Sequence, residues 1–297
     1  MKIESFPRKL FLFRNNLCMF AQTQNELHNM KHMSILAVSL LALVACTPEK
    51  KQEADYSQYV NPMIGTDFTG NTYPGAQVPF GMVQLSPDNG LPGWDRISGY
   101  FYPDTTIAGF SHTHLSGTGA GDLYDISFMP VTRPYKEAPA PLGIYSTFSH
   151  NDEAASAGYY RVLLKDYNIN VELTATERCG IQRYTFPEAE ASVFLNLKKA
   201  MNWDFTLDSK IEVVDSTTIR GYRLSQGWSP LQHVYFETRF SKPFVACHMD
   251  TTSIVTKEKG WIGTAYVARF DFNTKKDEEI LVTTGISGVS MEGAGKN

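Results

Sequence analysis

The clearest strand of the sequence is Ile169-Asn170-Val171-Glu172-Leu173-Thr174-Ala175. Apolar and polar side chains alternate along it, and successive residues of a β-strand point to opposite faces of the sheet. A strand with this pattern buries one face and exposes the other. The stretch therefore predicts a half-buried strand.

Short apolar or alternating runs continue on both sides of this strand. Turn-forming residues separate them at intervals of roughly 8–12 residues, which is typical of sandwiches and barrels. The runs are 126–131, 159–164, 181–186, 193–197, 211–213, 219–224, 233–240, 244–249, 264–270 and 280–286. No long amphipathic helices alternate with them, as βαβ units would require. The sequence predicts an all-β fold, namely a large antiparallel β-sandwich.

Residues 61–125 precede most of these runs and differ from them. They are rich in Gly, Pro, Thr, Ser and Asp and have no helical period. Long irregular segments inside a compact domain are usually functional or disordered. Aromatic residues and short apolar runs, such as Gly81-Met82-Val83-Gln84-Leu85, argue against disorder. We expect an ordered, loop-built N-terminal surface that the sandwich carries.

Charge and composition exclude one class of partner. The 297 residues carry a formal net charge of −4 and contain no basic run that would follow a phosphate backbone. Nucleic acid is therefore not an expected partner. The aromatic content of 12% suits a strand core and also suits a carbohydrate-facing surface.

The N-terminal region resembles an export signal. Residues 34–45 form an apolar run that is too short to span a bilayer comfortably, and Lys31 and His32 precede it. The run ends in Leu43-Val44-Ala45-Cys46, which resembles a bacterial lipobox. Cys46 is then the expected lipidation site, and the protein is expected in the bacterial cell envelope, anchored by lipid at the periplasmic or outer-membrane surface. A plain signal peptide with a chance cysteine is the alternative.

These features divide the chain. Residues 1–45 are expected to be an N-terminal extension plus signal peptide, with the natural start at Met30 or Met33, and residues 46–58 a polar tether. Residues 59–290 are the expected sandwich, and residues 291–297 the expected start of a polar linker without a helix. Within the folded part, export permits a disulfide between Cys179 and Cys247, whereas two buried free thiols are an equal possibility.

Several residues of the loop-rich stretch are candidates for ligand binding. Trp94 is either a partly buried lid or a stacking face for a pyranose ring, and Asp95 and Arg96 beside it have the charges to bind sugar hydroxyls. His112 and His114 are two residues apart, and a third ligand for zinc is not evident nearby. We interpret them as a pair that fixes the loop or contacts a sugar or a partner domain, and we predict no metal site.

Catalytic residues are not evident. Glycoside hydrolysis needs two carboxylates at a set separation. The aspartates in this region lie among turn residues, where they are common for structural reasons, and nothing in the sequence marks one as an acid or base. They are Asp88, Asp95, Asp104, Asp122 and Asp125.

Several linked motifs of the same stretch resemble one known family. They are VNPMIGT (60–66), NTYPGA (71–76), VPFGMVQLSPD (78–88), SGY (98–100) and IAGFSHTHLSGTG (107–119). In this order they resemble the N-terminal domain of glycoside hydrolase family 92, a family of bacterial exo-acting α-mannosidases. The resemblance is strongest over residues 59–131 and extends more loosely to the end of the chain.

The resemblance implies a supersandwich fold like that of galactose mutarotase, joined to an (α/α)6 barrel. In that family the barrel carries the acid and base carboxylates and a calcium site, and the enzymes invert anomeric configuration. The N-terminal domain supplies loops to the shared pocket, including a Trp that packs on the sugar, which Trp94 matches. This sequence lacks the barrel, so no catalytic residue and no calcium ligand is assigned to it.

Two hypotheses follow from the resemblance. In the first, the chain is the N-terminal domain of an α-mannosidase-like hydrolase acting on mannose-containing glycans, inactive without its missing C-terminal barrel domain. In the second, it is a stand-alone carbohydrate-binding or structural module of the cell surface.

Overall fold

The computed structural model describes residues 55–117, 119–140, 142–198, 203–256 and 261–297. The expectations for residues 1–45, for Cys46 and for most of the tether lie outside the described residues. Within the described ranges, no helix has the length and apolar composition needed to cross a membrane.

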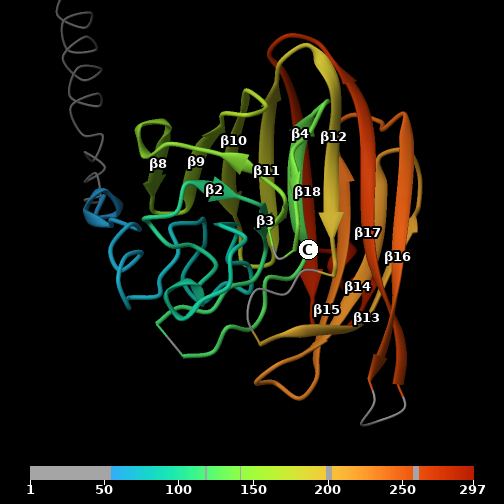
Figure 1. The fold of residues 1–297 in the computed structure, drawn as a ribbon, viewed down its shortest axis with the longest axis horizontal. Coiled ribbons are helices and arrows are strands. Elements are labelled where there is room, and N and C mark those ends of the chain that lie inside the picture. The colour runs from blue at the N-terminus through green and yellow to red at the C-terminus, as the bar shows by residue number, and fades with distance from the viewer. Residues whose placement is uncertain (1–54, 118, 141, 199–202, 257–260) are drawn as a thin grey trace, which may run out of the picture. The chain divides into compact units, whose positions relative to one another are not determined.

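Two large antiparallel sheets make up the domain (Figure 1). The six-stranded sheet contains, in spatial order, β1 (Ser86–Asp88), β3 (Gly109–Ser111), β4 (Ser127–Thr132), β12 (Ala189–Asn196), β17 (Trp261–Thr274) and β16 (Ala246–Thr256). The eight-stranded sheet contains β13 (Phe205–Val213), β14 (Thr218–Gln226), β15 (Gln232–Phe240), β18 (Glu278–Ser287), β11 (Cys179–Phe186), β10 (Ile169–Ala175), β9 (Tyr159–Leu164) and β8 (Glu153–Ser156).

Smaller elements accompany the two sheets. Two short ribbons pair β2 (Thr106–Ile107) with β7 (Ser146–Thr147) and β5 (Glu137–Ala138) with β6 (Gly143–Ile144). The short helices are η1 (Ser57–Tyr59), η2 (Trp94–Arg96), η3 (His150–Asp152) and α2 (Met291–Gly295).

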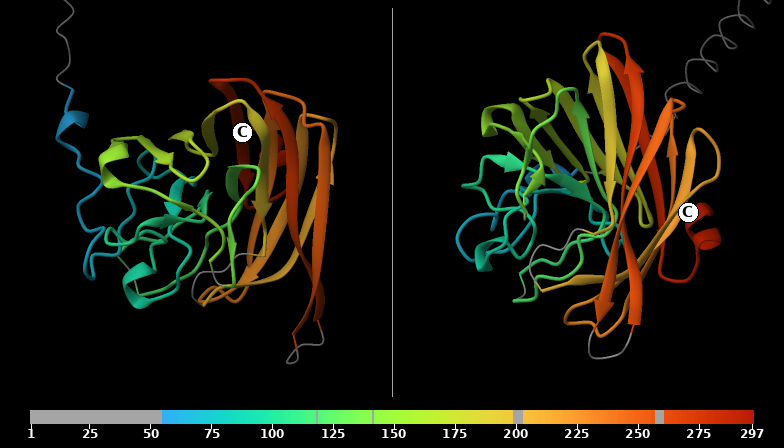
Figure 2. Two further views of the ribbon diagram at one scale, coloured as in Figure 1. Left: turned by 45° about the horizontal axis from the view of Figure 1, so that its top comes forward. Right: turned by 45° about the vertical axis from the view of Figure 1, so that its right-hand side comes forward.

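Aromatic side chains join the two sheets into one core, and Figure 2 shows the sheets from two further directions. Phe240 of β15 packs against Phe270 and Phe272 of β17, with ring centroids 5.3 and 5.6 Å apart, and against Phe128 of β4 at 6.4 Å. All four rings are buried, and each contributes roughly 1.5–3 kcal/mol through burial. The predicted antiparallel sandwich is confirmed.

The predicted strands match where the alternation was regular. The stretch 169–175 is β10 and 159–164 is β9, with the predicted bounds. The β16–β17 hairpin is longer than the runs 244–249 and 264–270 indicated, because backbone pairing continues through polar residues such as Thr251 and Thr252. A strand with polar residues on both faces has no alternation by which the sequence could reveal it.

Residues 291–295 correct one expectation, because they form the short helix α2 instead of an irregular linker. The Ser290 hydroxyl caps the helix by accepting a hydrogen bond from the backbone N–H of Gly293 at 2.9 Å. Ala294 is buried, and a Cβ at Gly285 of β18 would lie 2.2 Å from the Ala294 carbonyl oxygen. The glycine therefore lets the helix lie directly on the sheet, as part of the domain.

Cys179 is buried and Cys247 is half-buried, and both are free thiols. The structure thus favours the second of the two alternatives for this pair.

A buried arginine connects the loop-rich stretch to the eight-stranded sheet. Arg223 of β14 is completely buried, and its Nη1 donates to Asp125 Oδ1 at 2.6 Å and to Asp204 Oδ2 at 2.9 Å. Asp125 Oδ2 accepts hydrogen bonds from Thr113 Oγ1 at 2.7 Å and Gln232 Nε2 at 2.9 Å. One guanidinium therefore connects Asp125 of the loop-rich stretch to Asp204, which lies just before β13. Through Asp125 it is also linked to Gln232 of β15.

The arginine cluster leads to a stability prediction. Arg223→Ala leaves two buried carboxylates without their cation, so we expect a loss of about 3–5 kcal/mol in the free energy of unfolding, measured by urea denaturation. Arg239→Ala is the matched control, because Arg239 pairs with Glu237 on an exposed face, and such pairs contribute about 0–1 kcal/mol. Equal losses in the two variants would contradict the role assigned to Arg223.

Candidate functional site

Trp94 presents an aromatic face to solvent from a fixed turn. It begins η2, and its side chain is 58% exposed. The same turn is fastened by Arg96, whose Nε and Nη2 donate to the two carboxylate oxygens of Asp104 at 2.6 and 2.5 Å. Arg96 also lies over the Phe101 ring. Asp95 is half-buried beside Trp94, whereas Arg96 is engaged in holding the turn.

Trp203 forms a second exposed aromatic face next to the first. It is 49% exposed, and its ring centroid lies 6.0 Å from that of Trp94 with the planes tilted by 57°. Gly119 lies against the Trp94 ring, since a Cβ there would be 3.1 Å from it. We call these two exposed rings, whose planes are inclined to each other, the Trp94–Trp203 corner.

A buried carboxylate lies directly behind this corner. Asp204 is almost completely buried, and its Oδ2 accepts from Arg223 and from the backbone N–H of Leu123. Its Oδ1 has no hydrogen-bond partner among the described residues. Burial raises the pKa of Asp204 to about 6, a rise to which Asp125 and Asp122 add and which Arg223 opposes.

His112 and His114 do not lie on the surface, and this corrects their assignment as sugar-contacting residues. His112 is fully buried and donates from Nδ1 to the Ile126 carbonyl at 2.7 Å. Burial lowers the pKa of His112 to about 4, so its ring is neutral at pH 7. His114 is also buried, between the Gln84 carbonyl and the Asp88 carboxylate, at 2.7 and 2.8 Å. Both rings hold the loop through these hydrogen bonds, which was one of the three roles expected for this pair.

The remaining aspartates of the loop region also have structural partners. Asp88 binds His114 and the Ser111 hydroxyl, and Asp104 binds Arg96. Asp122 accepts from the backbone N–H groups of Trp228 and Ser229. None of these contacts isolates a pair of carboxylates across an open site.

The described residues do not fit a calcium site. Among residues 55–297 outside the undescribed gaps, no group of three or more His, Cys, Asp and Glu is placed to hold a metal ion. Where carboxylates do gather, at Asp125 and Asp204, the guanidinium of Arg223 already lies between them. We therefore assign no step to calcium in this part of the protein.

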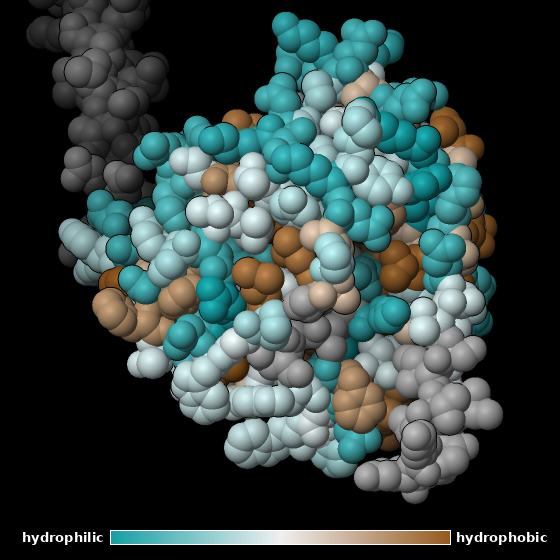
Figure 3. Space-filling view, viewed as in Figure 1, coloured by the Kyte–Doolittle hydropathy of each residue, from teal (hydrophilic) through white to brown (hydrophobic). Residues whose placement is uncertain are grey.

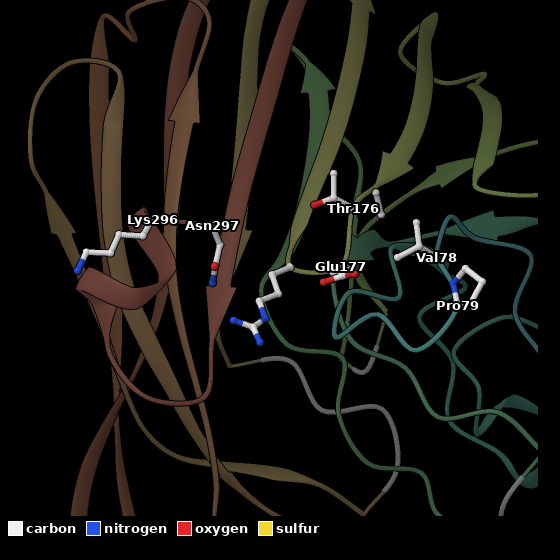
Figure 4. A pocket seen from close by; sticks show the side chains of 8 residues that line it. Val78, Pro79, Thr176, Glu177, Lys296 and Asn297 are labelled. Carbon is white, nitrogen blue, oxygen red and sulfur yellow. The ribbon is translucent and has the colours of Figure 1, made fainter.

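A wider hollow lies at another edge of the domain (Figure 4). Its volume is about 800 Å³, and it lies between Val78 and Pro79 on one side and Lys296 and Asn297 on the other. Next to it, Phe80 and Val289 are highly exposed. On the face seen in Figure 3, hydrophilic residues dominate and hydrophobic residues show in separate patches.

Sequence reasoning found Trp94 but missed Trp203. Trp203 stands alone in a connection before β13, with no periodic pattern around it. Its neighbour Asp204 is 19 residues from Arg223 in sequence, so the pairing that positions it could not be deduced from spacing.

Comparisons with known proteins find similarity over most of this chain. The model of the glycosyl hydrolase family 92 N-terminal domain matches residues 59–287. A GH92 α-mannosidase of Bacteroides thetaiotaomicron, solved with mannoimidazole, is 39% identical with a TM-score of 0.73, and the match covers 81% of this chain and 33% of that one. A GH92 inverting mannosidase of the same organism is 26% identical with a TM-score of 0.67, covering 83% and 33%.

A secreted glycosidase of Arthroderma benhamiae, described as uncharacterized, is 26% identical over 172 residues, which are 54% of this chain and 21% of that protein. The chain therefore spans a third or less of the length of these relatives.

The raised pKa of Asp204 predicts a pH-dependent stability difference. The Asp204 carboxyl has a higher pKa in the folded state, about 6, than in the unfolded state, about 4. Its contribution to the free energy of unfolding is therefore fully present below about pH 4 and is lost as the pH rises through about 6. We expect the unfolding free energy of Asp204→Asn, relative to wild type, to increase by up to about 3 kcal/mol between about pH 4 and pH 7. Urea denaturation across this range measures it, and parallel curves for the two proteins would refute it.

Proposed function

Because this chain belongs to glycosyl hydrolase family 92, whose N-terminal domain it contains over residues 59–287, we propose that it forms one half of a sugar-binding cleft. The substrate is an α-linked mannoside at the end of a mannose-containing glycan. The chain holds the sugar, and hydrolysis depends on groups that a further domain supplies.

The Trp94–Trp203 corner is the observation that carries this proposal. A pyranose ring has C–H faces that pack on aromatic rings and hydroxyl groups that donate to carboxylates. The corner offers two exposed rings, and Asp204 and Asp95 lie next to them. Fixed rings bind with little loss of side-chain entropy, and Arg96 and Gly119 fix Trp94.

The relatives support the choice of mannosides. Two are described as α-mannosidase and inverting mannosidase, and one was solved with mannoimidazole. An inverting glycosidase needs an acid and a base roughly 6.5–9.5 Å apart. Four aspartates of the loop region are already bound to Arg96, Arg223, His114 and backbone N–H groups, namely Asp104, Asp125, Asp88 and Asp122. We therefore place the acid, the base and the calcium requirement on a barrel domain outside this chain.

The exposed apolar residues near the wider hollow support a partner domain. Phe80 is fully exposed with φ of 60°, and Val289 is exposed close to it. Exposed apolar side chains of this size that gather together mark interaction surfaces. We assign this surface, defined by Phe80, Met82 and Val289, to contact with the barrel domain.

The lipobox-like motif suggests the location of this function. We propose that Cys46 is acylated and that the chain is anchored in the cell envelope, with the polar residues after Cys46 as the tether. The domain then faces glycans outside the cytoplasm.

The first test measures sugar binding at Trp94. We expect the 297-residue chain to bind mannose with quenching of tryptophan fluorescence, and Trp94→Ala to weaken that binding about threefold to tenfold, the range that stacking contributes. Tyr59→Ala, an exposed aromatic of η1, is the matched control and should bind as wild type does. Unchanged affinity in Trp94→Ala would remove the corner from the site.

The same chain, with calcium added, is expected to release no nitrophenol from 4-nitrophenyl α-mannoside. Turnover that persists after repurification would contradict the placement of catalysis on another domain. Sugar binding with no gain in activity on adding the barrel domain would favour a stand-alone binding module.

The second test concerns the anchor. Metabolic labelling with an alkyne fatty acid in a bacterial host should mark the wild-type chain and not Cys46→Ser. Labelling that survives in Cys46→Ser would exclude this cysteine as the acylation site.

A further inference from the structure

Trp228 is the most exposed tryptophan among the described residues, and a buried carboxylate holds it in place. It lies in the connection between β14 and β15 and is 76% exposed. Asp122 Oδ2 accepts hydrogen bonds from the backbone N–H groups of Trp228 and Ser229, at 2.5 and 3.3 Å. Gly227 admits this contact, because a Cβ there would lie 2.4 Å from Asp122 Oδ1. The turn is thus shaped by Asp122 and displays the indole to solvent.

A recess of about 350 Å³ lies beside this indole. Its other lining includes Leu115, Ala120, Leu123, Asp122 and Gln232. We call it the Trp228 recess. Its volume lies at the lower end of small-molecule sites, roughly 300–1,000 Å³, and the mixture of apolar walls with a few polar groups is typical of them.

The Asp122 carboxylate of the recess uses only one of its two oxygens, Oδ2, in the hydrogen bonds described above. Asp122 is 5% exposed, and its Oδ1 has no hydrogen-bond partner among the described residues. A buried polar atom that lacks a partner costs free energy, and such atoms in native proteins call for an explanation. Oδ1 is itself shielded from solvent, so the carboxylate must turn toward the recess before a ligand hydroxyl can donate to it and supply the missing hydrogen bond. Gln232, whose amide nitrogen is used by Asp125, offers its amide oxygen as a second acceptor.

The recess adjoins the Trp94–Trp203 corner through one loop. Gly119 lies against the Trp94 ring, and the next residue, Ala120, lines the Trp228 recess together with Asp122. On the other side, Arg223 binds Asp204, next to Trp203, and Leu123, which lines the recess. The corner and the recess are therefore connected through one loop and through Arg223.

We propose that the Trp228 recess is a second carbohydrate subsite, which binds another ring of the same manno-oligosaccharide while the terminal ring occupies the Trp94–Trp203 corner. This rests on the proposed function. The indole packs against a C–H face of the ring, and Asp122, once its carboxylate turns toward the recess, accepts a hydrogen bond from one of the hydroxyl groups of the ring.

The test compares a monosaccharide with an oligosaccharide on the full chain. Indole N–H signals in NMR spectra are followed during titration with mannose and with an α-linked mannotriose. Wild type is expected to bind mannotriose more tightly than mannose. Trp228→Ala should weaken mannotriose binding about tenfold and change mannose binding by less than about twofold. Trp94→Ala should weaken the binding of both sugars.

Two further variants control for structural effects. Trp228→Phe keeps an aromatic ring and should recover most of the mannotriose affinity. Such a recovery would show that the ring binds the sugar, and it would not be expected if Trp228→Ala had lost affinity by failing to fold. Tyr59→Ala should behave as wild type with both sugars.

The possible failures are distinguishable. Equal mannotriose affinity in Trp228→Ala and wild type, with a loss in Trp94→Ala, would refute the second subsite and leave the proposed function intact. No shift of any indole signal with either sugar would refute the proposed function, and the second subsite with it.

Discussion

The buried guanidinium of Arg223 is the constraint on which the loop surface depends. It joins Asp125 of the loop-rich stretch, Asp204 behind the Trp94–Trp203 corner and, through Asp125, Gln232 of the Trp228 recess. Desolvating these charges is expensive, so the arrangement is stable only while all of them are paired. Burial raises the pKa of Asp204, and the neighbouring Asp125 and Asp122 add to this rise. The same cluster therefore holds Asp204, the residue next to Trp203, and influences the pKa of its carboxyl group.

The sandwich and the loops contribute differently to the site. The sheets supply rigidity through aromatic packing such as that of Phe240, and their strand ends present the connections from which Trp203 and Trp228 project. Asp122 holds the backbone of Trp228, and Arg223 holds Asp204, the residue next to Trp203. Both indoles remain largely exposed. Sugars expose both C–H faces and hydroxyl groups, so aromatic rings next to carboxylates with spare acceptor oxygens suit this class of ligand.

The sequence predicted the fold where a local pattern existed and missed what depends on distant residues. The strict alternation of residues 169–175 gave β10 its bounds, whereas β16 and β17 extend through polar residues that show no period. Trp94 stood out because it lies among turn residues. Trp203 gave no such indication, and Trp228 was not singled out although it lies between the turn residues Gly227 and Ser229. The roles expected for His112 and His114 remained open because a His-Thr-His pattern says nothing about burial. The contact between Asp125 and Arg223 spans 98 residues, which no motif within one stretch could reveal.

That separation also determines the order in which the molecule can assemble. The loop that contains Asp125 leaves the ribosome well before Arg223, the cation that pairs with this aspartate, has been made. Contacts between residues so far apart in sequence form slowly, because closing the chain between them costs entropy before the contact contributes any favourable free energy. The loop surface therefore reaches its final shape only after β14 has joined the sheet. Until then its carboxylates remain hydrated and its aromatic rings can make non-native contacts, so this part of the domain most needs protection during synthesis.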